Sequence, residues 1–301
     1  MSRAQLDGVA GAAQRLAVLL GAGVAPAAAW SYLDAPAAAL AVAGRVEAGE
    51  AVATAVLSSA SDAGSAEPAW RGLAAAWQVA TDAGAPLAPA LRSFAVSLRA
   101  FAEASRAADA ALAAPIATAR MVMVLPAVGI LFGLVLGFNV LETLFTTPAG
   151  LVCLGGGALL LLAAWRWNRR LVAAAQPTEL TPGLRAELMA IAVGGGASID
   201  RAESTVERAL ELTGLDLGAQ GAGVAAVLEL SRRAGVPAAE LLRSDAEESR
   251  RDAASRAAQR ASVLAVKLML PLGVCILPAF MLVGVAPLLL SVISSTLVGF
   301  P

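Results

Sequence analysis

The stretch that decides the fold is Met121–Trp165, which reads MVMVLPAVGILFGLVLGFNVLETLFTTPAGLVCLGGGALLLLAAW. It contains one charged side chain, that of Glu142. A helix needs about 20 apolar residues to cross the hydrocarbon core of a bilayer, so the stretch is long enough for two crossings. A helix in a water-soluble protein keeps one face in water and rarely runs so far without charge. The stretch therefore predicts a membrane hairpin.

Polar residues divide this stretch near its middle. The segment NVLETLFTTP at 139–148 predicts a short extracytoplasmic turn, between a first transmembrane helix at 117–138 and a second at 149–166. A second uncharged stretch, Leu268–Pro301, predicts a third transmembrane helix at 266–285 and an apolar C-terminal tail at 286–301. The alternative for this last stretch is a hairpin that turns near Pro287.

Most charged residues gather in two other blocks. Residues 1–117 hold 7 basic and 9 acidic side chains, and residues 168–262 hold 12 and 13. Apolar residues recur there at spacings of three and four, and no segment alternates like a strand. We therefore expect an all-α, polytopic membrane protein with cytoplasmic helical domains at 1–116 and 167–265 and about three transmembrane helices.

Basic residues at the ends of the spans predict the orientation. The turn between the first two spans has no Lys or Arg, whereas the opposite ends carry Arg120, Arg166, Arg169, Arg170, Arg260 and Lys267. The positive-inside rule then places the N-terminus and both charged blocks in the cytoplasm. Trp165 and Trp167 are typical of anchors at the membrane interface.

The two charged blocks share a local pattern. The segments Ala83–Ala95 and Ala234–Ala246 have Gly, Pro, Leu, Arg and Ser at the same spacing, and Gly21–Gly23 is similar to Gly194–Gly196. The pattern predicts two homologous bundles, and the alternative is coincidence in an alanine-rich chain.

The repeated Gly-x-Pro pattern also predicts two helix–turn–helix connections. Gly84 and Gly235 suit the position just after a helix, where φ is positive. Pro86 and Pro237 suit the first turn of the helix that follows, where a missing N–H costs little.

The segment 238–262 is the most charged helix that we predict. Its acid–base pairs at a spacing of four stabilise an exposed helix. The simplest interpretation is a solvated face. The functional interpretation is a docking stripe for a cytoplasmic partner, with candidate contact residues Glu247, Arg250, Arg251 and Arg256.

The residues that most enzymes need are scarce. The chain has no histidine, and its two cysteines, Cys153 and Cys275, stand far apart in apolar stretches. The sequence contains no phosphate-binding glycine loop followed by lysine. We therefore expect no catalytic residues, no cofactor, no metal and no enzyme activity. A net charge of −1 and few aromatic residues also argue against binding to nucleic acid.

Three features in order resemble the type II secretion system F-domain family, the platform proteins of type II secretion systems, type IV pili and tight-adherence (Tad/Flp) pili. They are the glycine turns at 20–23 and 193–196, the Ala-Gly-x-Pro turns at 83–86 and 234–237, and the Leu-Pro pairs that end at Pro126 and Pro278. The small, alanine-rich chain looks most like the tight-adherence branch.

The resemblance implies a platform in the bacterial or archaeal cytoplasmic (inner) membrane. Its partners would be a cytoplasmic assembly ATPase, pilin or pseudopilin subunits, and a sister platform protein or further copies of itself. Pilin contact would involve the spans near Pro126 and Pro278, because proline frees a backbone carbonyl inside the membrane. Ordinary tolerance of proline in a membrane helix is the alternative for both residues.

Two other classes of function compete with this one. A subunit of an oligomeric transporter or channel would need a polar path, and the spans offer only a few uncharged polar residues. A membrane enzyme would need an activated nucleophile, and the chain has no imidazole to activate one.

Overall fold

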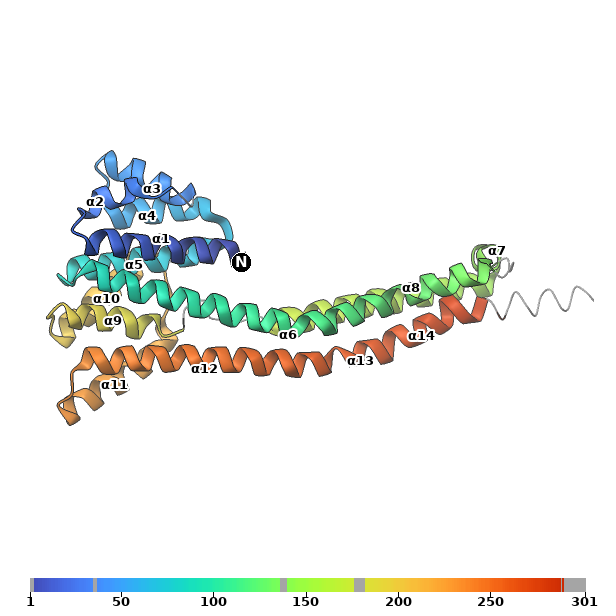
Figure 1. Ribbon diagram of the computed structural model, residues 1–301. Coiled ribbons are helices and arrows are strands. Elements are labelled where there is room, and N and C mark those ends of the chain that lie inside the picture. The colour runs from blue at the N-terminus through green and yellow to red at the C-terminus, as the bar shows by residue number, and fades with distance from the viewer. Residues whose placement is uncertain (1–2, 35–36, 136–139, 176–181, 288, 290–301) are drawn as a thin grey trace, which may run out of the picture. The chain divides into compact units, whose positions relative to one another are not determined.

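The computed structural model describes residues 3–34, 37–135, 140–175, 182–287 and 289. All regular elements in these ranges are helical, which confirms the all-α class (Figure 1). The α-helices before the second charged block are α1 (Arg3–Gly21), α2 (Pro26–Ala29), α3 (Ala37–Glu47), α4 (Val52–Ala60), α5 (Glu67–Asp82), α6 (Leu87–Val135), α7 (Val140–Thr146) and α8 (Pro148–Ala175). Those that follow are α9 (Leu184–Gly194), α10 (Ile199–Thr213), α11 (Gly221–Ala234), α12 (Ala238–Lys267), α13 (Met269–Pro271) and α14 (Leu277–Phe280).

Short 3₁₀ and π-helical turns complete the regular structure of the described chain. The 3₁₀ turns are η1 (Trp30–Tyr32), η2 (Ser61–Ala66) and η3 (Gly218–Gln220), and the π-helical turns are η4 (Leu272–Ile276) and η5 (Met281–Val285). The predicted turn at 139–148 contains the short helix α7.

The helices form two compact units. The first, which we call the helical unit, comprises Met1–Arg106 and Pro177–Arg256, and the second, the apolar unit, comprises Ala107–Gln176 and Ala257–Pro301. The boundaries fall within α6 and α12, so each of these helices contributes residues to both units.

The helical unit contains most of both charged blocks around one hydrophobic core. The sequence pattern predicts two bundles, but a single core cluster has members from Leu6 to Ala102 and from Leu184 to Ala246. Helix α5 of the first block contacts α9 and α10 of the second as well as α1 and α4 (Figure 1). Alanine fills much of this core and lets helices approach closely, while Trp30, Trp70 and Trp77 are its largest side chains.

Glycines allow close approaches in this core, both between the two blocks and within the first block. A Cβ on Gly195, which follows α9, would lie 2.5 Å from the carbonyl oxygen of Ala83, which follows α5. A Cβ on Gly72 in α5 would lie 3.1 Å from the ring of Phe94 in α6. A side chain at Gly195 would therefore push the backbones of the two blocks apart.

Helix α8 is the best-described apolar helix. Two helical stretches in the described residues, Pro148–Leu171 and Ala238–Val285, are long and apolar enough to cross a membrane. Only 17% of the most apolar window of α8 is buried, whereas the core helix of a water-soluble protein is mostly buried. Large apolar side chains such as Val152, Leu159 and Leu162 are exposed on it.

The remaining predicted membrane segments are described in part. The first predicted span at 117–138 lies within α6 as far as Val135, and its last three residues lie outside the described residues. Exposed apolar side chains of α6 in this range include Met121, Leu131 and Phe132. The tail at 286–301 lies outside the described residues except for positions 286, 287 and 289.

Small residues bring the apolar helices together. Gly129 of α6 lies against Phe280 and Gly284, and a Cβ at Gly157 of α8 would collide with Val283. Further along α8, Ala164 shares a small buried cluster with Cys275 and Ile276. As residue numbers rise along α8, the partner numbers fall, so α8 runs antiparallel to the C-terminal apolar helix.

Candidate functional site

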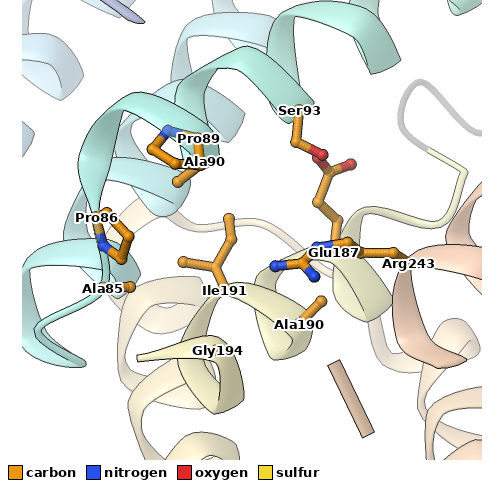
Figure 2. Close-up of a pocket in the computed structure, with 10 residues that line it drawn as sticks. All are labelled: Ala85, Pro86, Pro89, Ala90, Ser93, Glu187, Ala190, Ile191, Gly194 and Arg243. Atoms are coloured by element: carbon orange, nitrogen blue, oxygen red, sulfur yellow. The ribbon is translucent and has the colours of Figure 1, made fainter. Parts of the chain in front are cut away.

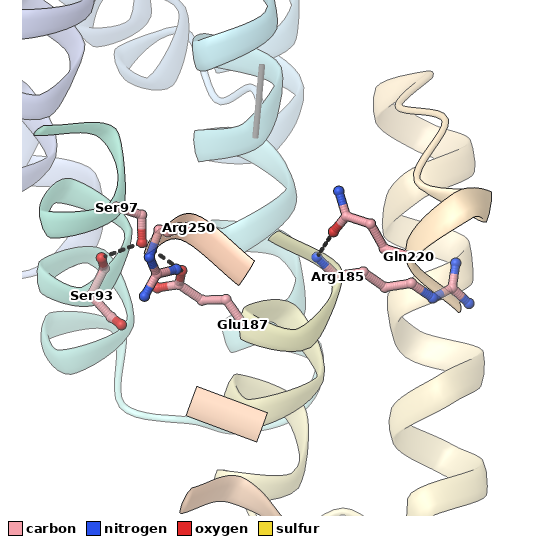
Figure 3. A network of polar contacts seen from close by, with 6 residues as sticks. All are labelled: Ser93, Ser97, Arg185, Glu187, Gln220 and Arg250. Atoms are coloured by element: carbon pink, nitrogen blue, oxygen red, sulfur yellow. Dashed lines mark hydrogen bonds and ion pairs between the residues drawn. The ribbon is translucent and has the colours of Figure 1, made fainter. Parts of the chain in front are cut away.

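The most buried ionic contact in the described helical unit centres on Glu187 of α9. Its carboxylate oxygen Oε2 accepts a hydrogen bond from Ser97 Oγ of α6 at 2.6 Å and one from Arg250 Nη1 of α12 at 2.9 Å (Figure 3). The Glu187 side chain is 3% exposed and that of Arg250 is 13% exposed. One carboxylate thus connects the two long helices, α6 and α12.

Burial of α9 explains why Glu187 needs these partners. Helix α9 reads LRAELMAIAVG, and all but three of its residues are buried. A helix that is apolar on all sides belongs in a core, and a charge in a core needs a counter-charge. Glu187 is not among the predicted site residues, although a lone acid in an apolar helix is itself a signal of a buried partner.

The position of Arg250 also has a sequence signal. Leu242 and Ala246 are fully buried on α12, and Arg250 continues their spacing of four on the same helix face. Arg250 therefore points into the unit. This corrects the prediction that Arg250 lies on an exposed docking stripe.

The other candidate contact residues do lie at the surface. Glu247 and Arg251 are exposed and form an ion pair at 3.1 Å. Arg256 is also exposed, and its Nε donates a hydrogen bond to the backbone carbonyl of Asp252 at 3.2 Å. Glu247 and Arg251, one turn apart, therefore form an exposed stripe on α12, whereas Arg256 lies about 140° around the helix from Arg251.

Asp245 is the titratable group with an altered pKa on this helix. Burial, and then the neighbouring charge of Glu248, raise its pKa above the ordinary value of 3.8. Both effects disfavour the ionised carboxylate.

A cavity of about 170 Å³ lies next to Glu187. The first turn of α6 and the face of α9 form its walls, and Figure 2 shows Pro86, Pro89, Ser93, Ile191 and Arg243 around it. Its polar lining is one carboxylate, one guanidinium and one hydroxyl. Such a set can hold a small polar group or water.

Two further contacts position helices in this unit, the first between the two blocks and the second inside the second block. Arg71 of α5 pairs with Glu67 at 2.5 Å and donates a hydrogen bond to the carbonyl oxygen of Thr213 at 3.3 Å. The backbone N–H of Arg185 donates to Gln220 Oε1 at 3.1 Å (Figure 3). These contacts help to place α5 and α9 against the end of α10 and the start of α11.

The paired turns have closely similar backbones. Gly84 and Gly235 have φ values of 66° and 67°, and each precedes a long helix. Gly23 and Gly196 both have φ of 89°. Glycine adopts this left-handed region without the steric penalty of a Cβ.

The prolines of these turns immediately precede their helices. The N–H of Ala90 donates to the carbonyl of Pro86, and that of Leu241 to the carbonyl of Pro237, each at 3.4 Å. Each proline therefore starts the hydrogen-bond pattern of α6 or α12 without needing a donor of its own.

The prolines of the apolar segments lie in different surroundings. Pro126 lies within α6, which continues past it to Val135. Pro278 lies in α14, between the π-helical turns η4 and η5. Because proline has no N–H and its ring crowds the carbonyl four residues earlier, widened turns beside Pro278 and Pro287 have a direct cause.

In the part of the chain that the structure describes, no three cysteine, aspartate or glutamate side chains form a group that could hold a metal ion. No protein-family profile, curated protein or solved structure matches this chain.

Proposed function

We propose that the chain is a platform protein of a tight-adherence (Tad/Flp) pilus or a related type II secretion machine. It sits in the cytoplasmic (inner) membrane of a bacterium or archaeon and couples a cytoplasmic assembly ATPase to the movement of pilin or pseudopilin subunits. The observation that carries the proposal is the pair of long helices α6 and α12. Each follows a Gly-x-Pro turn in the helical unit and continues into an apolar segment.

The proposal includes three membrane spans. Two have the length and composition required, and the apolar, exposed side chains of α6 beyond Met121 support the third. The N-terminus and the helical unit lie in the cytoplasm, because the basic residues gather at the ends of the spans next to it. Residues 286–301 then lie outside.

The proposal also includes an internal repeat. The matched φ values of Gly23 with Gly196 and of Gly84 with Gly235 support it, since both pairs come from the sequence likeness of the blocks. The two copies share one core rather than forming separate domains.

Force transmission has a physical basis in this arrangement. An ATPase that binds the exposed stripe Glu247 and Arg251 acts directly on α12. The buried contacts of Glu187 connect α12 to α6 through Arg250 and Ser97. A displacement of one long helix is therefore passed to the other, and both lead to the apolar segments where pilin contact is proposed.

Co-purification tests the partner. The tagged full-length protein is extracted in mild detergent from its native cells, and bound chains are identified. We expect a secretion-type ATPase, together with a sister platform protein or further copies of the chain. An oligomer that lacks any ATPase and conducts solutes in liposomes would favour a transporter or channel subunit instead.

Cysteine labelling tests the topology. In a variant with Cys153 and Cys275 replaced by alanine, a single cysteine is placed at Thr146, Ser204 or Ser295. A membrane-impermeant maleimide should label positions 146 and 295 in intact cells, and position 204 only after lysis. Labelling of position 204 in intact cells would reverse the proposed orientation, and protection of position 295 would rule out the third crossing.

A further inference from the structure

The charge of the chain is divided unequally between its two units. The apolar unit contains six basic residues and two acidic ones, whereas the helical unit contains sixteen basic and twenty-one acidic residues. A nearly neutral chain thus has a membrane part with a clear positive charge. Three of the six basic residues stand together at Arg166, Arg169 and Arg170 of α8.

These arginines share one face of α8 with an aromatic side chain. At about 100° per residue, Trp165, Arg166, Arg169 and Arg170 fall within an arc of about 140°. The guanidinium of Arg169 lies 5.3 Å from the centroid of the Trp165 ring, which is a cation–π contact. All four side chains are exposed.

The arginine face lacks an acidic partner in the described chain. None of the three guanidinium groups forms an ion pair with a described carboxylate. The nearest acids along the sequence are Glu142, 24 positions before Arg166, and Glu179, nine positions after Arg170. Arg166 and Arg170, one turn apart, repel each other unless an anion lies between them.

The packing of α8 adds a fourth cation at the same level. The antiparallel register that pairs Gly157 with Val283 and Ala164 with Ile276 places Lys267 about one turn, or about 5 Å, beyond Arg170. Lys267 is exposed at the end of α12. Lys267 therefore lies at the depth of the arginines, but Gly157 and Ala164 contact its side of the unit from the face of α8 opposite to the arginines.

Two tryptophans mark that depth as the membrane interface. Trp165 is 48% exposed and Trp167 is 41% exposed, at the point where the apolar sequence of α8 ends. Tryptophan prefers the headgroup region, with its ring in the acyl boundary and its N–H near water. The guanidinium groups next to them are therefore level with lipid phosphates.

We infer that Arg166, Arg169 and Arg170 form a binding site for anionic phospholipid headgroups on the apolar unit. Guanidinium groups bind phosphate oxygens in pairs, and the exposed tryptophan rings pack beside the glycerol and upper acyl chains. The site prefers a lipid with net negative charge, such as phosphatidylglycerol, over a zwitterionic one. This inference rests on the membrane insertion in the proposed function and not on the role in pilus assembly.

The test compares lipids that remain bound to the full-length protein. The protein in detergent is incubated with equal amounts of phosphatidylglycerol and phosphatidylcholine and repurified, and the retained lipids are quantified. Each arginine near an anionic surface contributes about a fivefold change in affinity, so the wild type should enrich phosphatidylglycerol by at least about tenfold. The variant R166Q/R169Q/R170Q should retain both lipids about equally.

A matched variant controls for loss of charge alone. R201Q/R232Q/R233Q removes three exposed arginines from the helical unit and should keep the enrichment. Enrichment that survives in R166Q/R169Q/R170Q, or that is absent from the wild type, would overturn the inference. Displacement of the bound lipid by inorganic phosphate at constant ionic strength would also overturn it, because the site would then recognise free phosphate.

Flotation with vesicles of phosphatidylcholine alone distinguishes absence of the lipid site from absence of the membrane insertion on which the proposed function depends. Wild type and R166Q/R169Q/R170Q should both float with these vesicles, since the apolar segments are unchanged. A wild-type protein that does not float would contradict membrane insertion itself. A wild-type protein that floats without a preference for phosphatidylglycerol would overturn only the lipid site.

Discussion

Arg250 Nη1 lies 2.9 Å from Glu187 Oε2, and both side chains are largely withdrawn from solvent. The exposed pair Glu247–Arg251, one turn away on α12, has nearly the same separation of 3.1 Å. Because the two pairs have similar lengths but different burial, the exposed pair is a control for the free energy of unfolding that is lost when the buried pair is broken.

We expect Glu187→Gln to destabilise the protein by about 3–5 kcal/mol, because it leaves the charge of Arg250 buried without a counter-charge. Glu247→Gln should cost less than about 1 kcal/mol, since water screens the exposed pair. Chemical unfolding of the full-length protein in detergent measures both. The double variant E187L/R250M should lose less stability than E187Q, and equal costs for E187Q and E247Q would contradict the buried contact.

A steric prediction concerns Gly195. Gly195→Ala places a methyl group 2.5 Å from the carbonyl oxygen of Ala83, and because that atom is backbone, the turn must shift. The φ of Gly195 is −76°, so the expected loss of about 1–3 kcal/mol comes from the clash and not from the backbone conformation.

Gly11→Ala is the control for Gly195→Ala. Gly11 lies within α1, and a Cβ there would meet no atom within 4 Å. Alanine favours a helix interior over glycine by about 0.5–1 kcal/mol, so this variant should gain stability. Unfolding midpoints of the two variants that move in the same direction would contradict the close approach of the two turns.

Asp245 predicts a dependence of stability on pH. Because its pKa is raised in the folded protein, its contribution is fully present below the ordinary carboxyl pKa and is lost as the pH rises through the folded pKa. Asparagine does not ionise, so the Asp245→Asn variant does not lose this stability as the pH rises. The variant should be more stable than the wild type at neutral pH, and the difference should vanish in acid. Thermal unfolding of both proteins from neutral to acid pH measures the difference in stability. A stability gain of the variant that grows in acid would contradict the raised pKa.

Leu159 tests whether α8 faces lipid. It is exposed near the middle of Pro148–Leu171. An arginine at the centre of a spanning helix costs about 2.5–3.5 kcal/mol, so Leu159→Arg should reduce the membrane-inserted fraction after alkaline extraction. Ser204→Arg, on the exposed surface of α10, should leave that fraction unchanged. Equal fractions in both variants would contradict a lipid-facing α8.

The sequence predicted those features of the fold that depend on local physics. The presence of only one charge over Met121–Trp165 indicates apolar helices, and glycine followed two residues later by proline indicates a turn with positive φ. Gly84 and Gly235 have that φ. Helix lengths were less predictable, because alanine continues a helix in either environment, so that α6 and α12 continue through both units.

Long-range packing could not be predicted from local sequence patterns. The alanine-rich faces of α5, α9 and α10 do not specify their partners, so the union of the two blocks in one core could not be predicted. The pairing of Glu187 with Arg250 spans 63 residues and depends on that packing. On α12, charges occupy every face, so only the spacing from Leu242 and Ala246 distinguishes Arg250 from its exposed neighbours.

The most direct measurement of the central proposal is photo-crosslinking in native cells. A photoreactive residue is placed at Arg251, on the exposed stripe, or at Ser204, on α10, and the crosslinked chains are identified by mass spectrometry. The account predicts a crosslink from position 251 to a secretion-type ATPase and none to that protein from position 204. Crosslinks from position 251 that capture no ATPase, in cells that assemble pili or secrete normally, would contradict it.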